Sequence, residues 1–318
     1  MTEIRPAAQN RARRAAKAEK IAVRTVSGFV KAVFLIGFCF AVLYPLMTIL
    51  SKSFMGRMDL FDNTVILVPK TFTLQNYQIA AMLMGYGEAL VNTATLSTIV
   101  MLLETASCLL VAYGLARFRF RLRGLFLVLV VFTLIVPPQL ILVPMVVQFS
   151  RYDPLGICTL LFGGSLNLID SFLPFGLLAA TAVGVKNGLF ILIFFQFFRN
   201  MPRELEEAAY IDGAGPVRAF LRIMLPGART MMVTVFLFGF VWTWLDIKYI
   251  PTLMPDMPLL VTEVQKISSL GLDASANTVA RSLLVNAGAV YLIVPLVLLY
   301  LFTQRYFVQS IERSGLVG

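Results

Sequence analysis

Residues 200–226 read NMPRELEEAAYIDGAGPVRAFLRIMLP, a stretch that predicts two short helices joined by a turn. Three glutamates fall in the first turns of the first helix, where they complement the positive end of its dipole. Gly213 and Gly215 are able to take the left-handed conformation that ends a helix. Pro216 suits the first turn of the second helix, and Pro226 is expected to end it.

The first of these helices carries a narrow face of mostly small residues. Leu205, Ala208, Ala209 and either Ile211 or Asp212 recur at spacings of three and four, so they share one side of the helix. Small side chains allow another surface to approach closely. The stretch therefore has the form of a docking element for a second protein, although these features do not name that protein.

The rest of the chain is strongly apolar. Of 318 residues, 58% are hydrophobic and 14% are charged, whereas soluble domains carry roughly 25% charge. A helix crosses a bilayer with about 20 apolar residues. The sequence predicts an all-α membrane protein with six such spans, at about 32–50, 89–116, 125–150, 179–198, 231–251 and 282–304.

Basic residues alternate between the segments that link these spans. Eight lie in a basic tail at 1–31, four follow the second span, five lie in the loop 199–230 and two follow the last span. The three intervening segments, 51–88, 151–169 and 252–280, together hold five. Since cytoplasmic segments are enriched in Lys and Arg, both termini and the loop 199–230 are predicted to be cytoplasmic. The net charge of +10 thus reports topology and not nucleic-acid binding.

Residues 155–178 are nearly uncharged and raise the question of a seventh span. An additional crossing would move one set of cytoplasmic arginines to the outside, against the charge bias. We therefore expect an outer-surface or re-entrant helix there, and a transmembrane domain that extends over 32–318.

Several kinds of chemistry are excluded by composition. Histidine is absent, which removes His-dependent catalytic triads and His-ligated metal sites. The three cysteines, Cys39, Cys108 and Cys158, lie far apart in apolar surroundings. No lysine completes a phosphate-binding loop of the form GxxxxGK[ST], so the chain is not expected to bind ATP by itself. No other cofactor and no metal is expected in this chain either.

The loop resembles the EAA loop of ABC importer membrane subunits at every motif position. In that family the loop is a coupling helix that sits in a groove of the ATP-binding subunit. The resemblance implies that Glu207 faces basic groups in that groove and that Gly213 forms a close-packed turn. The implied ATPase-coupling residues are Glu207, Ala208, Ala209, Asp212, Gly213, Ile223, Leu225 and Pro226.

Other segments are similar to the smaller permease of the maltose-type carbohydrate importers. These are residues 69–77, 112–118, 137–139 and 304–309. The resemblance implies a sugar substrate and alternating access in the bacterial cytoplasmic membrane. It also implies a second permease, two cytoplasmic ATP-binding subunits that bind ATP and Mg, and an extracytoplasmic solute-binding protein that contacts segments 51–88 and 252–281. The fifth span departs from the pattern at Trp244-Leu245-Asp246, where many relatives have Trp-Asn-Asp.

Polar residues inside the predicted spans are candidates for the solute pathway. Glu104 is either a pathway or gating residue or a carboxyl neutralised within the bundle. Lys186 poses the same question. Asp246 and Lys248 form either an interfacial pair or solute ligands.

Aromatic residues near the end of the fifth span have two interpretations. Trp242, Trp244 and Tyr249 are placed either to line a sugar path or to form the aromatic belt at the membrane interface. We take Glu104, Trp244 and Asp246 as the pathway candidates.

Two alternative functions remain open at this stage. One is an ABC importer permease for a non-sugar solute, and the other is a secondary transporter or membrane enzyme that works without an ATPase. No nucleophile with a base and no metal-ligand cluster is visible in the sequence to favour an enzyme.

Overall fold

The computed structural model describes residues 5–269 and 275–315, with side chains described over 24–269 and 281–304. Within these ranges the regular structure is helical apart from two isolated β-bridges. In chain order the elements are α1 (Arg5–Ser53), η1 (Arg57–Phe61), α2 (Gln75–Met84), α3 (Tyr86–Arg117), α4 (Arg123–Ile135), α5 (Gln139–Ser150), η2 (Pro154–Gly156), α6 (Ile157–Phe162), α7 (Leu173–Ala180), α8 (Asn187–Asn200), α9 (Glu204–Ile211), α10 (Pro216–Ala219), the π-helical turn η3 (Phe220–Met224), α11 (Leu225–Gly227), α12 (Arg229–Trp244), α13 (Tyr249–Leu253), α14 (Leu260–Ser269) and α15 (Ser275–Gly315).

Three of the described helices are long and apolar enough to cross a membrane without a break. They are the segment Arg24–Ser53 of α1, all of α3 and the segment Arg281–Gln304 of α15. Each contains one of the predicted spans. α1 begins at Arg5, so the backbone of the predicted basic tail continues into the first span as one helix.

Two further crossings are bent. α4 and α5 meet at 103° around Pro137 and Pro138, because proline lacks the amide hydrogen and its ring clashes with the preceding helical turn. The predicted span at 125–150 is therefore not a continuous helix. The segment Pro216–Gly227 meets α12 at 68°.

The predicted fourth span at 179–198 also differs from the structure. α7 ends at Ala180, and α8 begins at Asn187 and is 14 residues long. Ala182 between them has a φ of 57°, a left-handed conformation that no helix continues through. The region predicted as one outer or re-entrant helix, 155–178, contains the short helix α6, an extended link and most of α7.

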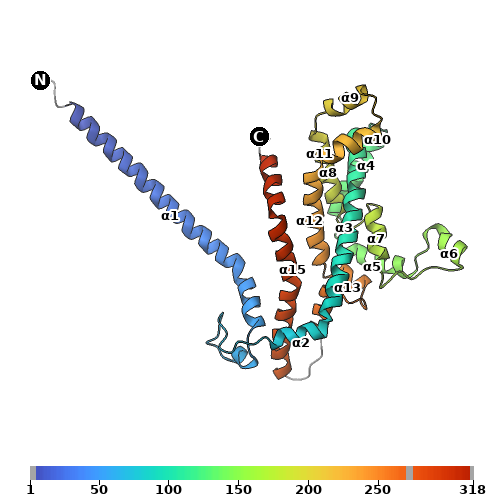
Figure 1. The fold of residues 1–318 in the computed structure, drawn as a ribbon, viewed down its shortest axis with the longest axis horizontal. Coiled ribbons are helices and arrows are strands. Elements are labelled where there is room, and N and C mark those ends of the chain that lie inside the picture. The colour runs from blue at the N-terminus through green and yellow to red at the C-terminus, as the bar shows by residue number, and fades with distance from the viewer. Residues whose placement is uncertain (1–4, 270–274, 316–318) are drawn as a thin grey trace.

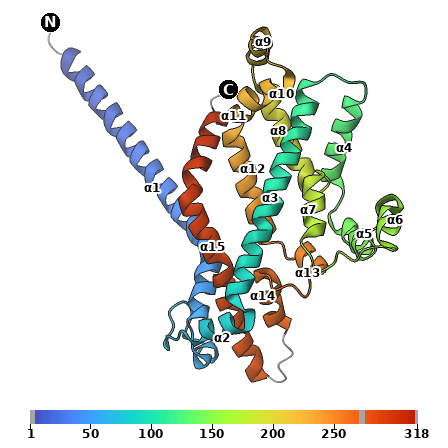
Figure 2. The same ribbon diagram turned by 45° about the vertical axis from the view of Figure 1, so that its right-hand side comes forward.

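α3 is the central helix of the bundle. It packs against α7, α8 and α12, while α15 lies beside α12 and α14 and α1 contacts α15 (Figures 1 and 2). α9 and α10 form one end of the molecule, and the N-terminal part of α1 and the C-terminal part of α15 point toward that same end (Figure 1). α2 lies at the opposite end.

The bundle is held together by close packing of aromatic and small residues. Phe190, Phe194 and Phe198 of α8 are buried. Gly188 lets α8 approach α4, since a Cβ there would lie 3.0 Å from the carbonyl oxygen of Val130. In lipid, contacts of this kind between small residues drive helix association, because the tails are as apolar as the side chains.

Some expectations concern side chains that lie outside the described ranges. The basic side chains of residues 1–23, most of the 304–309 motif, the arginines at 305 and 313 and part of the segment 252–281 belong to this group.

Candidate functional site

The hairpin at 200–226 projects from the end of the bundle and contains α9 (Figure 2). Its turn is set by Gly213, which has a φ of 79°. The Gly213 amide donates to the Tyr210 carbonyl at 3.1 Å, and the Ala214 amide donates to the Ala209 carbonyl at 2.9 Å. This pair of bonds is a Schellman motif, in which a left-handed residue satisfies the last carbonyls of a helix.

Gly215 does not share this conformation. Its φ is −73°, so it sits as an ordinary extended residue before Pro216, which opens α10. Pro226 does not end the second helix either: it lies near the start of α11, and the helical chain turns only at Ala228. The expectations for these two residues were wrong.

One buried carboxylate attaches α9 to the bundle. Tyr113 Oη of α3 donates to Glu206 Oε1 at 2.8 Å, and Arg117 Nε lies 3.3 Å from Glu206 Oε2. Arg117 Nη2 also donates to the Met201 carbonyl at 2.8 Å. The Arg117 and Glu206 side chains are 5% and 9% exposed, so this end of α3 is linked directly to the base of the hairpin.

Aromatic rings complete the attachment. The Tyr113 ring packs on Phe220 of η3 and on Phe198 of α8, at centroid distances of 4.6 and 5.4 Å. α3, α8 and η3 therefore converge around the Tyr113 ring, whose hydroxyl binds the Glu206 carboxylate.

The side of α9 that points inward shares only Ala209 with the face predicted to dock a second protein. Glu206 and Ala209, three positions apart, are buried, whereas Leu205, Ala208 and Asp212 are exposed. The inward position of Glu206 was missed by sequence reasoning. The available signal for its burial was the i, i+3 spacing to Ala209. Its partner Arg117 was noted in the sequence only as one of several basic residues that indicate a cytoplasmic segment.

The remaining motif residues divide between the core and the surface. Ile223 and Leu225 are half-buried and pack against the bundle core, whereas Glu207 is exposed. Ile211 is 86% exposed and Val217 is 72% exposed. The hairpin thus presents an acidic residue together with uncovered apolar side chains.

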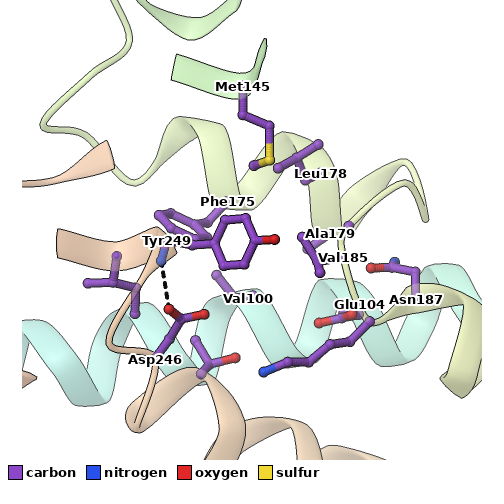
Figure 3. Close-up of a pocket in the computed structure, with 14 residues that line it drawn as sticks. Val100, Glu104, Met145, Phe175, Leu178, Ala179, Val185, Asn187, Asp246 and Tyr249 are labelled. Atoms are coloured by element: carbon purple, nitrogen blue, oxygen red, sulfur yellow. Dashed lines mark hydrogen bonds between the residues drawn. The ribbon is translucent and has the colours of Figure 1, made fainter. Parts of the chain in front are cut away.

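A second candidate site lies in the interior of the bundle, where α3, α5, α7 and the α12–α13 link meet (Figure 3). A cavity of about 70 Å³ is lined there by Glu104, Asn187, Asp246 and Tyr249 among others. Next to it lies a larger cavity of about 490 Å³, which shares Lys186, Asp246 and Tyr249 with the first.

Two of the three pathway candidates line this region. Glu104 and Asp246 both line the smaller cavity, with Lys186 beside them. Asp246 Oδ1 accepts the backbone amides of Lys248 and Tyr249 at 2.9 and 2.8 Å. Among the described side chains, an ion pair between Asp246 and Lys248 is not present.

The third candidate, Trp244, lies elsewhere. It is buried, and its Nε1 donates to the Leu292 carbonyl of α15 at 3.0 Å. Trp242 instead lines the larger cavity, and its ring lies 5.1 Å from Lys186 Nζ. Trp244 therefore joins two helices, whereas Trp242 faces the polar region.

With both sites described, the chain can be compared with known proteins. The family model described as "Binding-protein-dependent transport system inner membrane component" matches residues 108–313. The chain belongs to this family. The match includes the hairpin, Glu206 and Asp246, and it confirms the prediction of a membrane permease subunit of an ABC importer.

Similar proteins bear permease names. The chain is 26% identical to the "Probable ABC transporter permease protein YurM" of Bacillus subtilis (strain 168), over 90% of this chain and 87% of that protein. It is 25% identical to the "Probable starch degradation products transport system permease protein AmyC" of Thermoanaerobacterium thermosulfurigenes, over 84% of this chain and 89% of that protein. It is 29% identical to the "sn-glycerol-3-phosphate transport system permease protein UgpE" of Pectobacterium atrosepticum, over 86% and 92%.

The fold is also similar to a solved structure. A chain of a bacterial ABC transporter involved in the import of the acidic polysaccharide alginate aligns with a TM-score of 0.69 at 21% identity, over 89% of this chain and 96% of that one. The helical permease architecture is thereby confirmed. Like its relatives, the chain is a transport subunit and not an enzyme.

Proposed function

We propose that this chain is one of two permease subunits in an ATP-driven, binding-protein-dependent importer that carries a carbohydrate by alternating access. Two cytoplasmic ATP-binding subunits power the cycle and bind ATP and Mg. A solute-binding protein delivers the solute on the other side. The observation that carries the proposal is the family match, which includes the hairpin and its Schellman turn at Gly213.

The proposed topology has six crossings with both termini and α9 in the cytoplasm of a bacterial cell. The three unbroken helices and the two bent pairs account for five crossings by length and composition. We assign the sixth to α7 and α8 together, which are interrupted at 181–186. The common direction of α9, the start of α1 and the end of α15 supports a shared side (Figure 1), and the charge distribution assigns that side to the cytoplasm.

The proposed coupling contact is the exposed face of the hairpin. Glu207 is exposed, and Leu205, Tyr210 and Ile211 on the same short helix are exposed as well. An uncovered apolar patch rimmed by charge is typical of a protein interface. Docking on the ATP-binding subunit would bury this patch, while Glu206 would transmit its displacement to α3.

The proposed solute class rests on the relatives. Among the similar proteins, one is named for starch degradation products and another for sn-glycerol-3-phosphate. Both solutes are polyols or derivatives of them. A non-sugar solute remains the alternative, and ligand screening of the cognate binding protein would decide between them.

The coupling role is tested by replacing Glu207 with Arg in the complete complex. We expect loss of the ATP-binding subunit from the purified complex and loss of stimulated ATP hydrolysis, at unchanged membrane levels of the permease. Asp256→Arg is the matched control for retention of the ATP-binding subunit, because Asp256 is an exposed carboxyl in the α13–α14 link and not in the hairpin; stimulated hydrolysis is compared with wild type alone, since the binding protein is expected to contact 252–281. Retention of the ATP-binding subunit by the Glu207 variant, with normal hydrolysis, would overturn the assignment.

A further inference from the structure

Three helix interruptions meet at one place in the bundle. They are the α4–α5 break at 136–138, the α7–α8 break at 181–186 and the α12–α13 break at 245–248. The cavity of about 490 Å³ is lined by residues from all three, including Val136, Lys186 and Asp246. Irregular backbone is tolerated at membrane depth only where protein covers it or where it lines a water-filled cavity. The convergence therefore marks an open cavity where polar side chains such as Lys186 and Asp246 lie among apolar ones.

The breaks are also linked to one another. Tyr249 Oη donates to the Pro138 carbonyl at 2.5 Å, which joins the α12–α13 break to the α4–α5 break. The Pro138 carbonyl also accepts the Ile141 amide at 3.2 Å, so the Tyr249 hydroxyl is a second donor to this oxygen at the start of α5. Two of the three interruptions are therefore joined by a side-chain hydrogen bond, and the third, at 181–186, shares the cavity lining with them.

Among the described residues, a buried polar group on the lining of the smaller cavity lacks a partner. This lining includes Glu104, which is only 7% exposed, and Asn187. Asn187 is 1% exposed, and its Oδ1 has no partner while its Nδ2 donates to Cys108 Sγ at 3.3 Å. Buried polar groups in proteins are nearly always hydrogen-bonded, so an unpartnered amide oxygen on the cavity lining requires a reason. A hydrated cavity that receives a polar solute supplies one.

The side chains in this region suit a polyhydroxylated solute. Glu104, Asp246 and the Asn187 amide oxygen accept hydrogen bonds, and Lys186 donates them. Phe175 and Tyr249 line the smaller cavity and Trp242 lines the larger one, so apolar ring faces accompany the polar groups. In the close-up, Glu104, Asp246 and Tyr249 converge on the same space from different elements (Figure 3). Acceptors for hydroxyl hydrogens next to ring faces for C–H groups match the two kinds of surface on a sugar.

The charged side chains that line the two cavities indicate which solutes the site accepts. The described lining of the two cavities holds two carboxyl groups, Glu104 and Asp246, and two ammonium groups, Lys186 and the exposed Lys248. Because the acidic groups equal the basic groups in number, a phosphate or carboxylate of a solute would meet no surplus positive charge. An unpaired buried charge is costly, and such a site therefore discriminates against anions.

We propose that the cavities around Glu104, Lys186 and Asp246 form a solute-binding site on the translocation pathway, selective for uncharged polyhydroxylated solutes over anionic ones. This inference rests on the proposed transport function. It separates the chain from relatives named for a phosphorylated polyol and for an importer of an acidic polysaccharide.

The test measures how the charge of a small reagent affects its entry. Thr243 lines the smaller cavity and is half-buried, which makes Thr243→Cys a suitable reporter. Cys39, Cys108 and Cys158 are first replaced by Ser in the full complex. If this chain folds poorly, Cys108 is retained, since it is fully buried. The reporter is then labelled with trimethylammonium-ethyl, sulfonatoethyl and uncharged methyl methanethiosulfonates, each rate being normalised to that of a free thiol.

We expect the cationic and the uncharged reagents to label Thr243→Cys faster than the anionic reagent, by roughly tenfold, as is usual for a cleft whose charge repels one sign of ion. Combining the reporter with Glu104→Gln and Asp246→Asn leaves Lys186 in excess and should invert the preference. Combining it with Lys186→Gln should strengthen the original preference. Absence of labelling in every nucleotide state, or equal rates for the two charged reagents, would overturn the inference. Failure of the proposed transport function would appear separately, as a permease that does not co-purify with an ATP-binding subunit.

Discussion

Arg117 Nε lies 3.3 Å from Glu206 Oε2, with both side chains buried, so the last turn of α3 is joined directly to α9. α3 also carries Glu104 of the interior cavity. One helix therefore extends from the hairpin to the polar region. Movement of α9 has a direct mechanical route to the cavity along this helix, because a helix is a rigid element.

Glu206→Ala should weaken the joint between α9 and α3. Removing one partner of a buried ion pair costs about 3–5 kcal/mol, because the other charge is left uncompensated. We expect a lower melting temperature of the complex and less solute transported per ATP hydrolysed. The neighbouring variant Glu207→Ala is the matched control: Glu207 is exposed, so the melting temperature of the permease measured without the ATP-binding subunits should fall for Glu206→Ala and not for Glu207→Ala, while the latter loses the ATP-binding subunit.

Neutralising Glu206 provides a second check on the contact between α9 and α3. Glu206→Gln keeps the hydrogen bond from Tyr113 but removes the ion pair, and its effect should lie between those of wild type and Glu206→Ala. If Glu206→Ala and Glu207→Ala give the same pattern of stability and coupling, the distinct roles assigned to these adjacent residues are wrong.

Gly213→Ala should loosen the hairpin turn. Gly213 has a φ of 79°, and an L-residue in the left-handed region costs roughly 1–2 kcal/mol. We expect faster proteolytic cleavage between α9 and α10 and reduced stimulated ATP hydrolysis. Gly215→Ala is the control, because Gly215 has a φ of −73° and a Cβ there meets nothing within 4 Å. Equal behaviour of the two variants would show that the left-handed turn is not needed.

Acidification should open the loop that precedes α2. Asp59 is buried, and it accepts the Thr71 amide at 2.9 Å and the Thr71 hydroxyl at 2.8 Å. These bonds, with that from the Thr71 amide foremost, hold the pKa of Asp59 below its ordinary value of 3.8. Because the pKa is lower in the folded loop, the stabilisation is present above the unfolded pKa and is lost as the pH falls through the folded one.

Hydrogen exchange of peptides from 56–73, followed from pH 7 down to about pH 3 and corrected for the intrinsic rate, measures this opening. Asp59→Asn should raise the exchange at neutral pH and flatten its pH dependence. A wild-type loop whose protection is unchanged across this range would contradict the role given to the carboxylate.

Gly188→Ala should separate α8 from α4. A Cβ at this position would lie 2.2 Å from Thr133 Oγ1 and 3.0 Å from the Val130 carbonyl oxygen, and backbone does not yield easily. We expect a lower melting temperature of the detergent-solubilised complex. Gly114→Ala is the matched helical control, with nothing within 4 Å of the added Cβ. It should leave stability unchanged or raise it by about 0.5–1 kcal/mol, because alanine loses less backbone entropy than glycine. A stability loss shared by both variants would point to a general effect of helix glycines.

The membrane character and the hairpin could be read from the sequence alone. Long apolar segments, the alternation of basic residues and the motif from Glu207 to Pro226 need no tertiary information, because each depends on local composition or spacing. Gly213 and Gly215 were both recognised as able to form the turn for the same reason, and the structure has the left-handed conformation at Gly213. The left-handed conformation of a single residue is a local property.

Tertiary structure decided which polar side chains meet. The sequence does not distinguish Glu206 from Glu207, since both are glutamates on one short helix, and only the approach of Tyr113 and Arg117 makes one of them buried. The sequence also does not tell whether Trp242 or Trp244 faces the cavities. In the structure the Trp244 indole donates to the Leu292 carbonyl of α15, which places this side chain between two helices. The break between α7 and α8 lies in an apolar stretch that periodicity treats as one span. Pairings across many residues depend on how helices pack, and neither composition nor spacing along one helix contains that information.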